Sequence, residues 1–177
     1  PLMMWLVAAL FELAGVSVWA ARLPSALFAT AAVLMTGLLG RRLLDARVGW
    51  LAAVLAASSY GTFTSASNLR LESGVTFAAV TGAYAAVRAI QDGRPAWLLL
   101  VGVAAGLGGM LKPVAPLHVY LASGLVLACH RPRWLRHPVY LASAALALLV
   151  LLPWHAAAMR IGGDEFAVVY FGQEIGS

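Results

Sequence analysis

Charged side chains are scarce in this sequence, and their scarcity decides the class of the protein. Only 11% of the 177 residues are charged, whereas 62% are hydrophobic, and an ordinary soluble domain has roughly a quarter of its residues charged. A soluble fold of this length cannot hide so much apolar surface, because too little polar surface is present to cover the outside. The composition therefore excludes a soluble globular protein and predicts one whose solvent is lipid.

Cysteine is almost absent as well. The single cysteine, Cys129, excludes a disulfide framework and a thiolate metal site. The net charge of +5 would indicate nucleic-acid binding in a soluble protein, but topology explains a basic excess in a membrane protein. We therefore expect the lipid bilayer, and no nucleic acid, as a partner. The residues specify no cofactor, and a divalent cation stays one option.

Six intervals without Asp, Glu, Lys or Arg predict membrane-spanning helices. Each interval is apolar on all sides rather than on one face, and about 20 residues cross a bilayer core of about 30 Å. The predicted fold class is all-α: a polytopic transmembrane helix bundle that forms a single domain over residues 1–177. The predicted spans are 23–40, 48–69, 73–87, 95–111, 113–129 and 138–159.

Residues 1–21 form a further apolar segment, which carries Glu12 in its middle. A carboxylate at the centre of a bilayer costs about 2.5–3.5 kcal/mol on insertion scales. We therefore expect a helix that lies in the interface or leans on the bundle, with a seventh span as the alternative. The six-span bundle is predicted over residues 22–159 and the start of an external loop over residues 160–177. Because the chain starts at Pro1 and stops just after a polar run, we expect it to be a piece of a longer protein.

The connections between the intervals alternate in charge. Three connections together hold eight of the 12 basic residues, and the positive-inside rule assigns their side to the cytoplasm. We therefore expect a multi-pass protein of the inner (plasma) membrane whose chemistry faces the extracytoplasmic side. The charged residues expected on that side are Arg22, Arg70, Lys112, Arg160, Glu72, Asp164, Glu165 and Glu174.

Two tight external turns hold candidate site residues. Arg70 and Glu72 are two residues apart in a turn that lets both point into one cavity, although a solvated hairpin pair is the alternative. Lys112 precedes a proline, which disfavours helix at the residue before it, so its ammonium is expected at the membrane edge. This compact charge suits a phosphate, while a snorkelling lysine is the alternative. Arg22, two residues before a proline, is expected at the start of a helix.

Several short runs, in chain order, carry a resemblance to a known family. They are PLMMWL at 1–6, GVSVWAARLPSAL at 15–27, GRRL at 40–43, RLESGVTF at 70–77, GLGGMLKPVA at 106–115, PWH at 153–155 and GGDEF at 162–166. The sequence resembles the aminoarabinose transferase and protein O-mannosyltransferase group, which are polytopic glycosyltransferases of the C superfold. The resemblance implies a dolichyl- or undecaprenyl-phosphate sugar donor, an acceptor reached from the outer leaflet, and transfer outside the cytoplasm.

The resemblance also implies roles for individual residues. Glu72 matches a supporting carboxylate, and the main catalytic aspartate is expected upstream of residue 1, so this piece alone is expected to be inactive. Lys112 matches the lysine of a Thr-Lys-Gly-Pro-Val motif, here without its threonine and glycine. His155 replaces the tyrosine of a Pro-Trp-Tyr motif. A departing polyprenyl phosphate is an anion that cations stabilise, which makes Lys112, Arg22 and Arg70 candidate substrate-binding residues. His155 is the fourth candidate for substrate binding, with a role in packing as the alternative.

A non-enzymatic multi-span membrane protein, such as a transporter fragment, is the alternative function. Transporters tend to carry broken helices and ionisable groups near the middle of the membrane. Most of the charges in this sequence, apart from Glu12, fall instead at the ends of the predicted spans. The residues do not specify the sugar or the acceptor.

Overall fold

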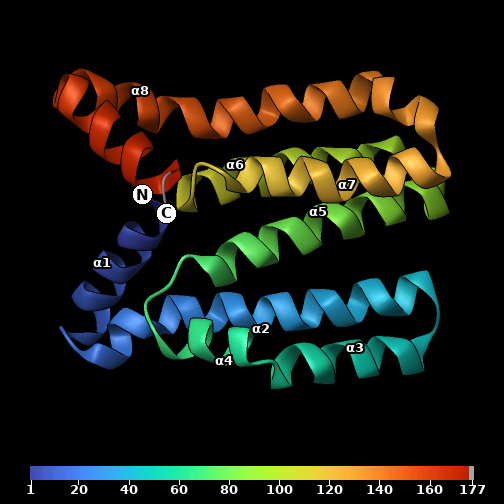
Figure 1. Cartoon of the computed structure of the whole chain (residues 1–177), viewed down its shortest axis with the longest axis horizontal. Coiled ribbons are helices and arrows are strands. Elements are labelled where there is room, and N and C mark those ends of the chain that lie inside the picture. The colour runs from blue at the N-terminus through green and yellow to red at the C-terminus, as the bar shows by residue number, and fades with distance from the viewer. Residues whose placement is uncertain (176–177) are drawn as a thin grey trace.

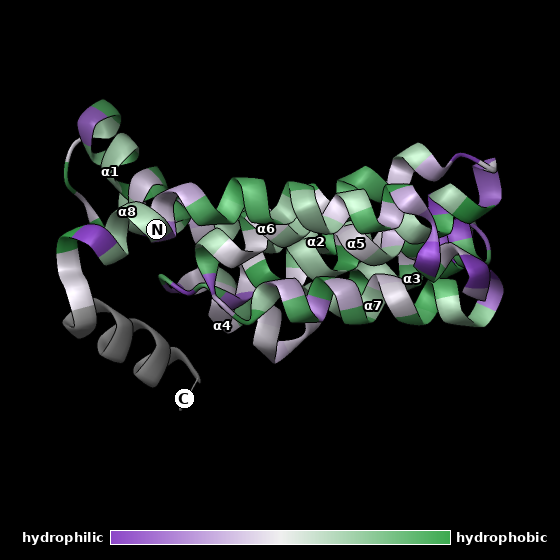
Figure 2. Ribbon diagram, turned by 90° about the horizontal axis from the view of Figure 1, so that it is seen from above, coloured by the Kyte–Doolittle hydropathy of each residue, from purple (hydrophilic) through white to green (hydrophobic). Residues whose placement is uncertain are grey.

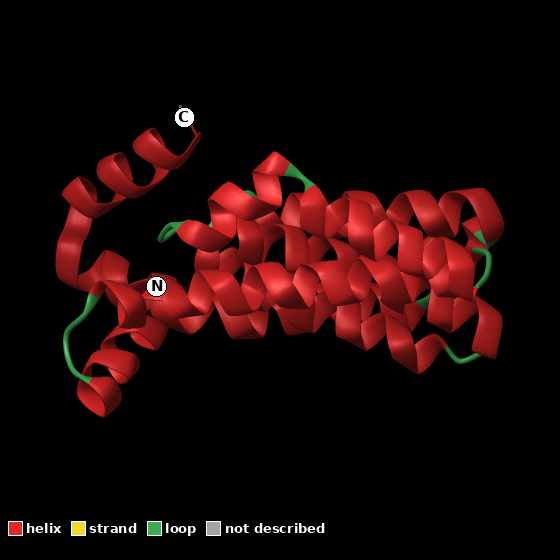
Figure 3. Ribbon diagram, turned by 90° about the horizontal axis from the view of Figure 1, so that it is seen from below, coloured by secondary structure: helices red, strands yellow, loops and turns green. Residues whose placement is uncertain are grey.

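The computed structural model describes the backbone of residues 1–175 and the side chains of residues 1–163. Over the described backbone the chain consists of helices and short connections without a strand (Figure 3), which confirms the predicted all-α helix bundle. The elements are α1 (Leu2–Ala14), α2 (Val18–Leu43), α3 (Ala46–Ser58), α4 (Tyr60–Ser67), α5 (Glu72–Asp92), η1 (Pro95–Trp97), α6 (Leu98–Leu111), α7 (Ala115–His130), η2 (Pro132–Arg136) and α8 (Pro138–Ile175).

The long helices run side by side, and α5 lies in the middle of the bundle (Figure 1). Helix α5 packs against α2 on one side and against α6 and α7 on the other. Helix α8 packs on α6, and α3 packs on α2. Hydrophobic residues cover most of the length of the bundle, and hydrophilic residues gather towards its ends (Figure 2).

The alternating direction of the helices sorts the charged connections to opposite ends of the bundle (Figure 1). One end, which we call the basic end, carries Arg41, Arg42, Arg47, Arg88, Arg94, Arg131, Arg133 and Arg136. The opposite end, which we call the outer end, carries Arg22, Arg70, Glu72 and Lys112. The structure thus separates the two groups as the sequence predicts, and the assignment of the basic end to the cytoplasm stays a prediction.

Small residues let the central helices approach one another closely. Ala85, Ala86 and Ala89 of α5 are completely buried in the core. A Cβ atom on Gly102 of α6 would overlap the backbone oxygen of Ser143 in α8. Helices in membranes associate through this kind of close packing, so α6 and α8 depend on a glycine at their crossing.

The predicted span 48–69 is divided into two helices. Ser59 separates α3 from α4 with an extended backbone (φ −70°, ψ 138°), and its hydroxyl accepts a hydrogen bond of 3.3 Å from the N–H of Thr62. A serine hydroxyl offers the backbone a capping partner and so favours a new helix start. The prediction of one continuous span is therefore wrong here. It is based on the lack of charged residues, and a capping serine carries no charge.

The predicted helix start at Arg22 is also wrong. Helix α2 begins at Val18, where the hydroxyl of Ser17 accepts a hydrogen bond of 3.2 Å from the N–H of Ala20. Pro24 therefore lies inside the helix and is buried. Two signals for a helix start compete in this segment. The serine cap prevails because its hydroxyl provides a hydrogen-bond partner for a free N–H group, whereas a proline in the first turn only removes one N–H group that would lack a partner.

Three helices in the described part of the chain are long and apolar enough to cross a membrane: Val18–Leu43, Glu72–Asp92 and Pro138–Gly163. The remaining predicted spans correspond to shorter apolar helices, at Ala46–Ser58, Pro95–Leu111 and Ala115–His130. Since a bilayer core needs about 20 residues, long side chains at the ends of the shorter helices have to extend towards the headgroups.

Helix α1 packs against α2 and α6 at the outer end, and it is inclined to the long helices (Figures 1 and 2). It has 13 residues, the same length as α3, and is shorter than the roughly 20 residues that cross a bilayer core. Glu12 on this helix is exposed. The choice between a helix that leans on the bundle and a seventh span stays a prediction.

The backbone from residue 160 to residue 175, where the sequence predicts the start of an external loop, is helical, and its place outside the membrane stays a prediction. Helix α8 is interrupted at Gly163, which has a φ of 54°, and a second helical stretch follows to Ile175. Acidic residues favour the first turn of a helix, and Asp164 and Glu165 directly follow the break. The side chains of Asp164, Glu165 and Glu174 lie outside the described residues.

Candidate functional site

A pocket of about 430 Å³ lies at the outer end, between α2, α4 and the start of α5. We call it the hydroxyl pocket. Arg70 and Glu72 both line it, so the two charges that the sequence places in one turn do share one cavity. The hydroxyl-bearing residues that line it are Ser59, Thr62, Thr64, Ser65, Ser73 and Thr76.

Ser25 of α2 holds the turn that carries Arg70. The side chain of Ser25 is completely buried. Its Oγ accepts a hydrogen bond from the N–H of Arg70 and donates one to the carbonyl oxygen of Arg70, each at 3.0 Å. Because the turn between α4 and α5 has no helix of its own to satisfy these groups, the contact anchors Arg70 to α2.

Glu72 is the first residue of α5 and is exposed. An acidic residue in the first turn of a helix interacts favourably with the N–H groups at the helix start, so Glu72 suits its place at the start of α5. The ion pairs among the described side chains join Asp92 to Arg42 and Arg88, and none joins Arg70 to Glu72. Both charges at the pocket are therefore available to a ligand.

The wall of the pocket formed by α4 was not predicted as part of a site. Because residues 48–69 contain no charged side chain, the sequence predicts a membrane span for them, although six of the ten residues from 58 to 67 are Ser or Thr. The hydroxyls of Ser59 and Thr62 form a hydrogen bond of 2.9 Å with each other. A dense run of hydroxyl groups inside an otherwise apolar interval is the signal that would have indicated this wall.

Lys112 ends α6, as its place before a proline predicts. Its backbone is extended (φ −143°, ψ 132°), and its N–H donates a hydrogen bond of 2.9 Å to the carbonyl oxygen of Gly108. The preceding residue, Leu111, lies against Gly74 near the start of α5. Lys112 is half-buried and lies at the same end of the bundle as Glu72, but it does not line the hydroxyl pocket.

Arg22 and His155 do not line the hydroxyl pocket either. Arg22 is exposed on α2, one turn before Ser25. His155 is half-buried on α8, with its Nδ1 atom 2.8 Å from the carbonyl oxygen of Leu151 and its ring edge-on to Trp154 at 4.8 Å between centroids. The structure therefore brings Arg70 and Glu72 together and leaves Arg22 and His155 outside their pocket.

No group of three or more His, Cys, Asp or Glu side chains in the described part of the chain could hold a metal ion. These residues therefore provide no set of ligands for the divalent cation that the sequence allows as an option.

A family model described as dolichyl-phosphate-mannose-protein mannosyltransferase matches residues 1–156. The chain belongs to this family. The matched range covers the bundle from α1 into α8 and contains every residue that lines the hydroxyl pocket. Membership of this mannosyltransferase family indicates membrane glycosyltransferase activity, in agreement with the resemblance seen in the sequence. No curated protein and no solved structure shows a significant match to it.

Proposed function

We propose that this chain forms the membrane core of a glycosyltransferase that moves a hexosyl or pentosyl group from a polyprenyl-phosphate donor to an acceptor. Transfer takes place on the extracytoplasmic side of the inner (plasma) membrane. The observation that supports this function best is the hydroxyl pocket, in which a cation and a carboxylate share one cavity with many hydroxyl groups. The pocket lies at the end opposite the basic end, which the positive-inside rule assigns to the cytoplasm.

The donor phosphate needs cations around it. Transfer breaks the bond between the anomeric carbon of the sugar and a phosphate oxygen, and the polyprenyl phosphate leaves with additional negative charge. In this proposal the guanidinium of Arg70 binds two phosphate oxygens through its planar fork, and the ammonium of Lys112 adds a compact charge. Stabilisation of charge that develops on the leaving group accelerates the step. Arg22 and His155 contact the substrate at the edge of the site.

The sugar and the acceptor need partners for their hydroxyl groups. A serine or threonine hydroxyl both donates and accepts hydrogen bonds, so the wall of α4 suits a saccharide. Glu72 acts as a supporting carboxylate that accepts a hydrogen bond from the sugar or the acceptor. The carboxylate that takes the proton of the acceptor as the new bond forms is expected in the segment upstream of residue 1.

Sugar transfer by the full-length protein in vesicles tests the proposal. Arg70→Gln and Glu72→Gln each remove one charge at the pocket, and each is expected to lower kcat/KM about ten- to a hundredfold, the effect of losing a charge-assisted contact. Arg94→Gln and Asp45→Asn remove the same charges at the basic end, where asparagine still caps α3. Equal losses in the pocket and control variants, or unchanged transfer by both pocket variants, contradict the proposed site.

A transporter remains the second candidate because the chain breaks at Ser59 between α3 and α4, and broken helices are common in transporters. The family match favours the glycosyltransferase. The same vesicles separate the two functions, since a transporter moves the lipid-linked sugar across the bilayer without forming a glycosylated acceptor.

A further inference from the structure

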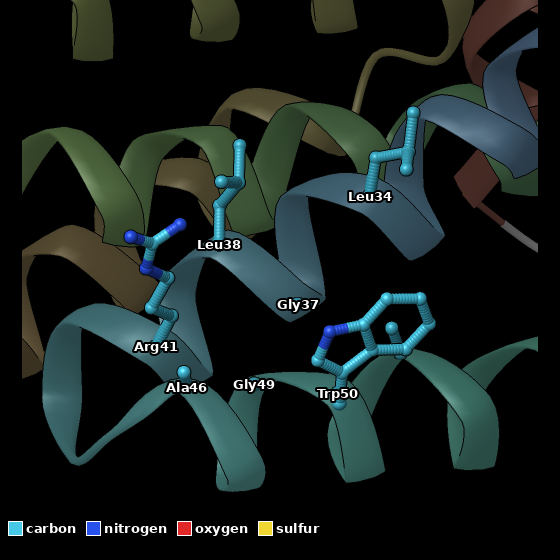
Figure 4. Close-up of a pocket in the computed structure, with 8 residues that line it drawn as sticks. Leu34, Gly37, Leu38, Arg41, Ala46, Gly49 and Trp50 are labelled. Atoms are coloured by element: carbon cyan, nitrogen blue, oxygen red, sulfur yellow. The ribbon is translucent and has the colours of Figure 1, made fainter.

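An apolar groove of about 360 Å³ lies between α2 and α3, towards the basic end (Figure 4). It is separate from the hydroxyl pocket and shares no lining residue with it. The hydrophobic and glycine residues that form its walls are Leu34, Gly37, Leu38, Ala46, Gly49, Trp50 and Ala53, and Arg41 lies at one end.

Two glycines bring the helices together beside this groove. A Cβ atom on Gly49 of α3 would lie 2.6 Å from the carbonyl oxygen of Gly37 in α2. Large side chains stand next to this close contact, and Leu34 and Trp50 are 61% and 75% exposed. Figure 4 shows the Trp50 indole reaching from α3 into the space between the two helices. In a bilayer such an exposed apolar groove faces acyl chains.

A polar pocket of about 550 Å³ adjoins the groove. Its lining residues are Leu38, Arg41, Arg42, Tyr84 and Gln91. Leu38 and Arg41 line both cavities, so the apolar groove shares a wall with a space lined by two arginines, Arg41 and Arg42. This order, an apolar channel that ends at cations, matches the order of chemical groups along a phospholipid.

The charge around the polar pocket favours an anion. The basic end holds eight arginines and two carboxylates, Asp45 and Asp92, which is a net charge of 8 − 2 = +6. The carboxylate of Asp45 accepts hydrogen bonds from two N–H groups of α3, and Asp92 lies 2.7 Å from Arg88 and 3.9 Å from Arg42. Arg41 is exposed and has no ion-pair partner among the described side chains.

We propose that the groove and the polar pocket together bind one anionic phospholipid of the bilayer, of the phosphatidylglycerol type. Its acyl chain lies along the groove against Trp50, and its phosphate accepts hydrogen bonds from the guanidinium of Arg41. Basic pockets between membrane helices are suited to anionic headgroups. A neutral phospholipid would leave Arg41 without a counter-charge, and a soluble anion would leave the groove uncovered. This inference does not depend on the proposed function.

Native mass spectrometry of the full-length protein in detergent, with phosphatidylglycerol or phosphatidylcholine added, tests this inference. Arg41→Gln is expected to weaken phosphatidylglycerol binding about tenfold, and Trp50→Ala about threefold without a change of charge. Arg133→Gln removes a charge at the same end outside both cavities, and Trp19→Ala removes a tryptophan that is 71% exposed on α2. Neither control is expected to lower binding more than about twofold, and phosphatidylcholine is expected to bind weakly to every variant.

Several results would overturn the lipid site. An equal loss for Arg41→Gln and Arg133→Gln would indicate a diffuse basic surface, which attracts anionic lipids without a specific pocket. Unchanged binding by Trp50→Ala, or displacement of the lipid by inorganic phosphate, would reduce the site to an anion pocket. Tighter binding of polyprenyl phosphate than of phosphatidylglycerol would assign the groove to the donor instead.

Discussion

Ser25→Ala should uncouple Arg70 from the helix that positions it. The substitution removes two hydrogen bonds of 3.0 Å from a completely buried side chain. It leaves the N–H of Arg70 without its partner and the carbonyl oxygen of Arg70 with only the 3.5 Å hydrogen bond from the hydroxyl of Ser73. At about 0.5–1.5 kcal/mol for each hydrogen bond, the anchored turn loses about 1–3 kcal/mol. That loss lowers the ratio of docked to undocked turn by a factor of about 5 to 150.

Transfer by the full-length protein, measured per folded molecule, reports this change. We expect kcat/KM of Ser25→Ala to fall about tenfold, because Arg70 spends less time in the hydroxyl pocket. Ser123→Ala is the matched control. Ser123 is also completely buried, but its hydroxyl bonds to the carbonyl oxygen of Val119 at 2.8 Å and to the hydroxyl of Tyr140 at 3.2 Å.

Ser123→Ala is expected to lower the melting temperature by a few degrees and to leave kcat/KM unchanged. If Ser25→Ala also keeps its kcat/KM while its melting temperature falls, the bond to Arg70 serves stability alone. If both variants lose kcat/KM in proportion to their fall in melting temperature, the loss of activity reflects general destabilisation. Either result would refute the reasoning that the turn must be anchored for Arg70 to act.

Three further predictions concern the outer end, the core and the topology. Lys112→Ala is expected to lower transfer about ten- to a hundredfold and Lys112→Arg to restore part of it; equal activity of both variants and the wild type would remove Lys112 from the site. Gly102→Ala is expected to reduce the yield of folded protein, since its Cβ overlaps Ser143 and overpacking costs about 1–3 kcal/mol, whereas Gly61→Ala, with no atom within 4 Å of the added Cβ, should express normally. In a Cys129→Ala background, Asn68→Cys and Arg94→Cys should react with a membrane-impermeant thiol reagent from opposite sides, and labelling from one side would refute the topology.

Features that depend on local composition could be predicted from the sequence. The helical bundle, the separation of its charged ends and the end of α6 at Lys112 follow from apolar runs, charge spacing and a proline. The shared pocket of Arg70 and Glu72 follows from their common turn.

Features that depend on competition between local helix signals, or on contacts between residues far apart in the sequence, could not be predicted. The Ser17 and Ser59 caps compete with other local signals, and propensity does not say which signal prevails. The bond from Ser25 to Arg70 joins residues 45 positions apart, and no local pattern in the sequence indicates it. The groove between α2 and α3 arises from the register of glycines on two helices, which only their packing reveals.

Helix α4 gives the hydroxyl pocket walls of unequal local stability. It has eight residues, and none of them is buried, whereas the opposite walls belong to α2 and α5, which pack directly against each other. Short segments with few buried contacts open at a low free-energy cost, far below that of global unfolding. A substrate that enters between these walls therefore meets a fixed surface that sets the position of the charges and a compliant surface whose hydroxyl groups can adapt to the shape of the sugar.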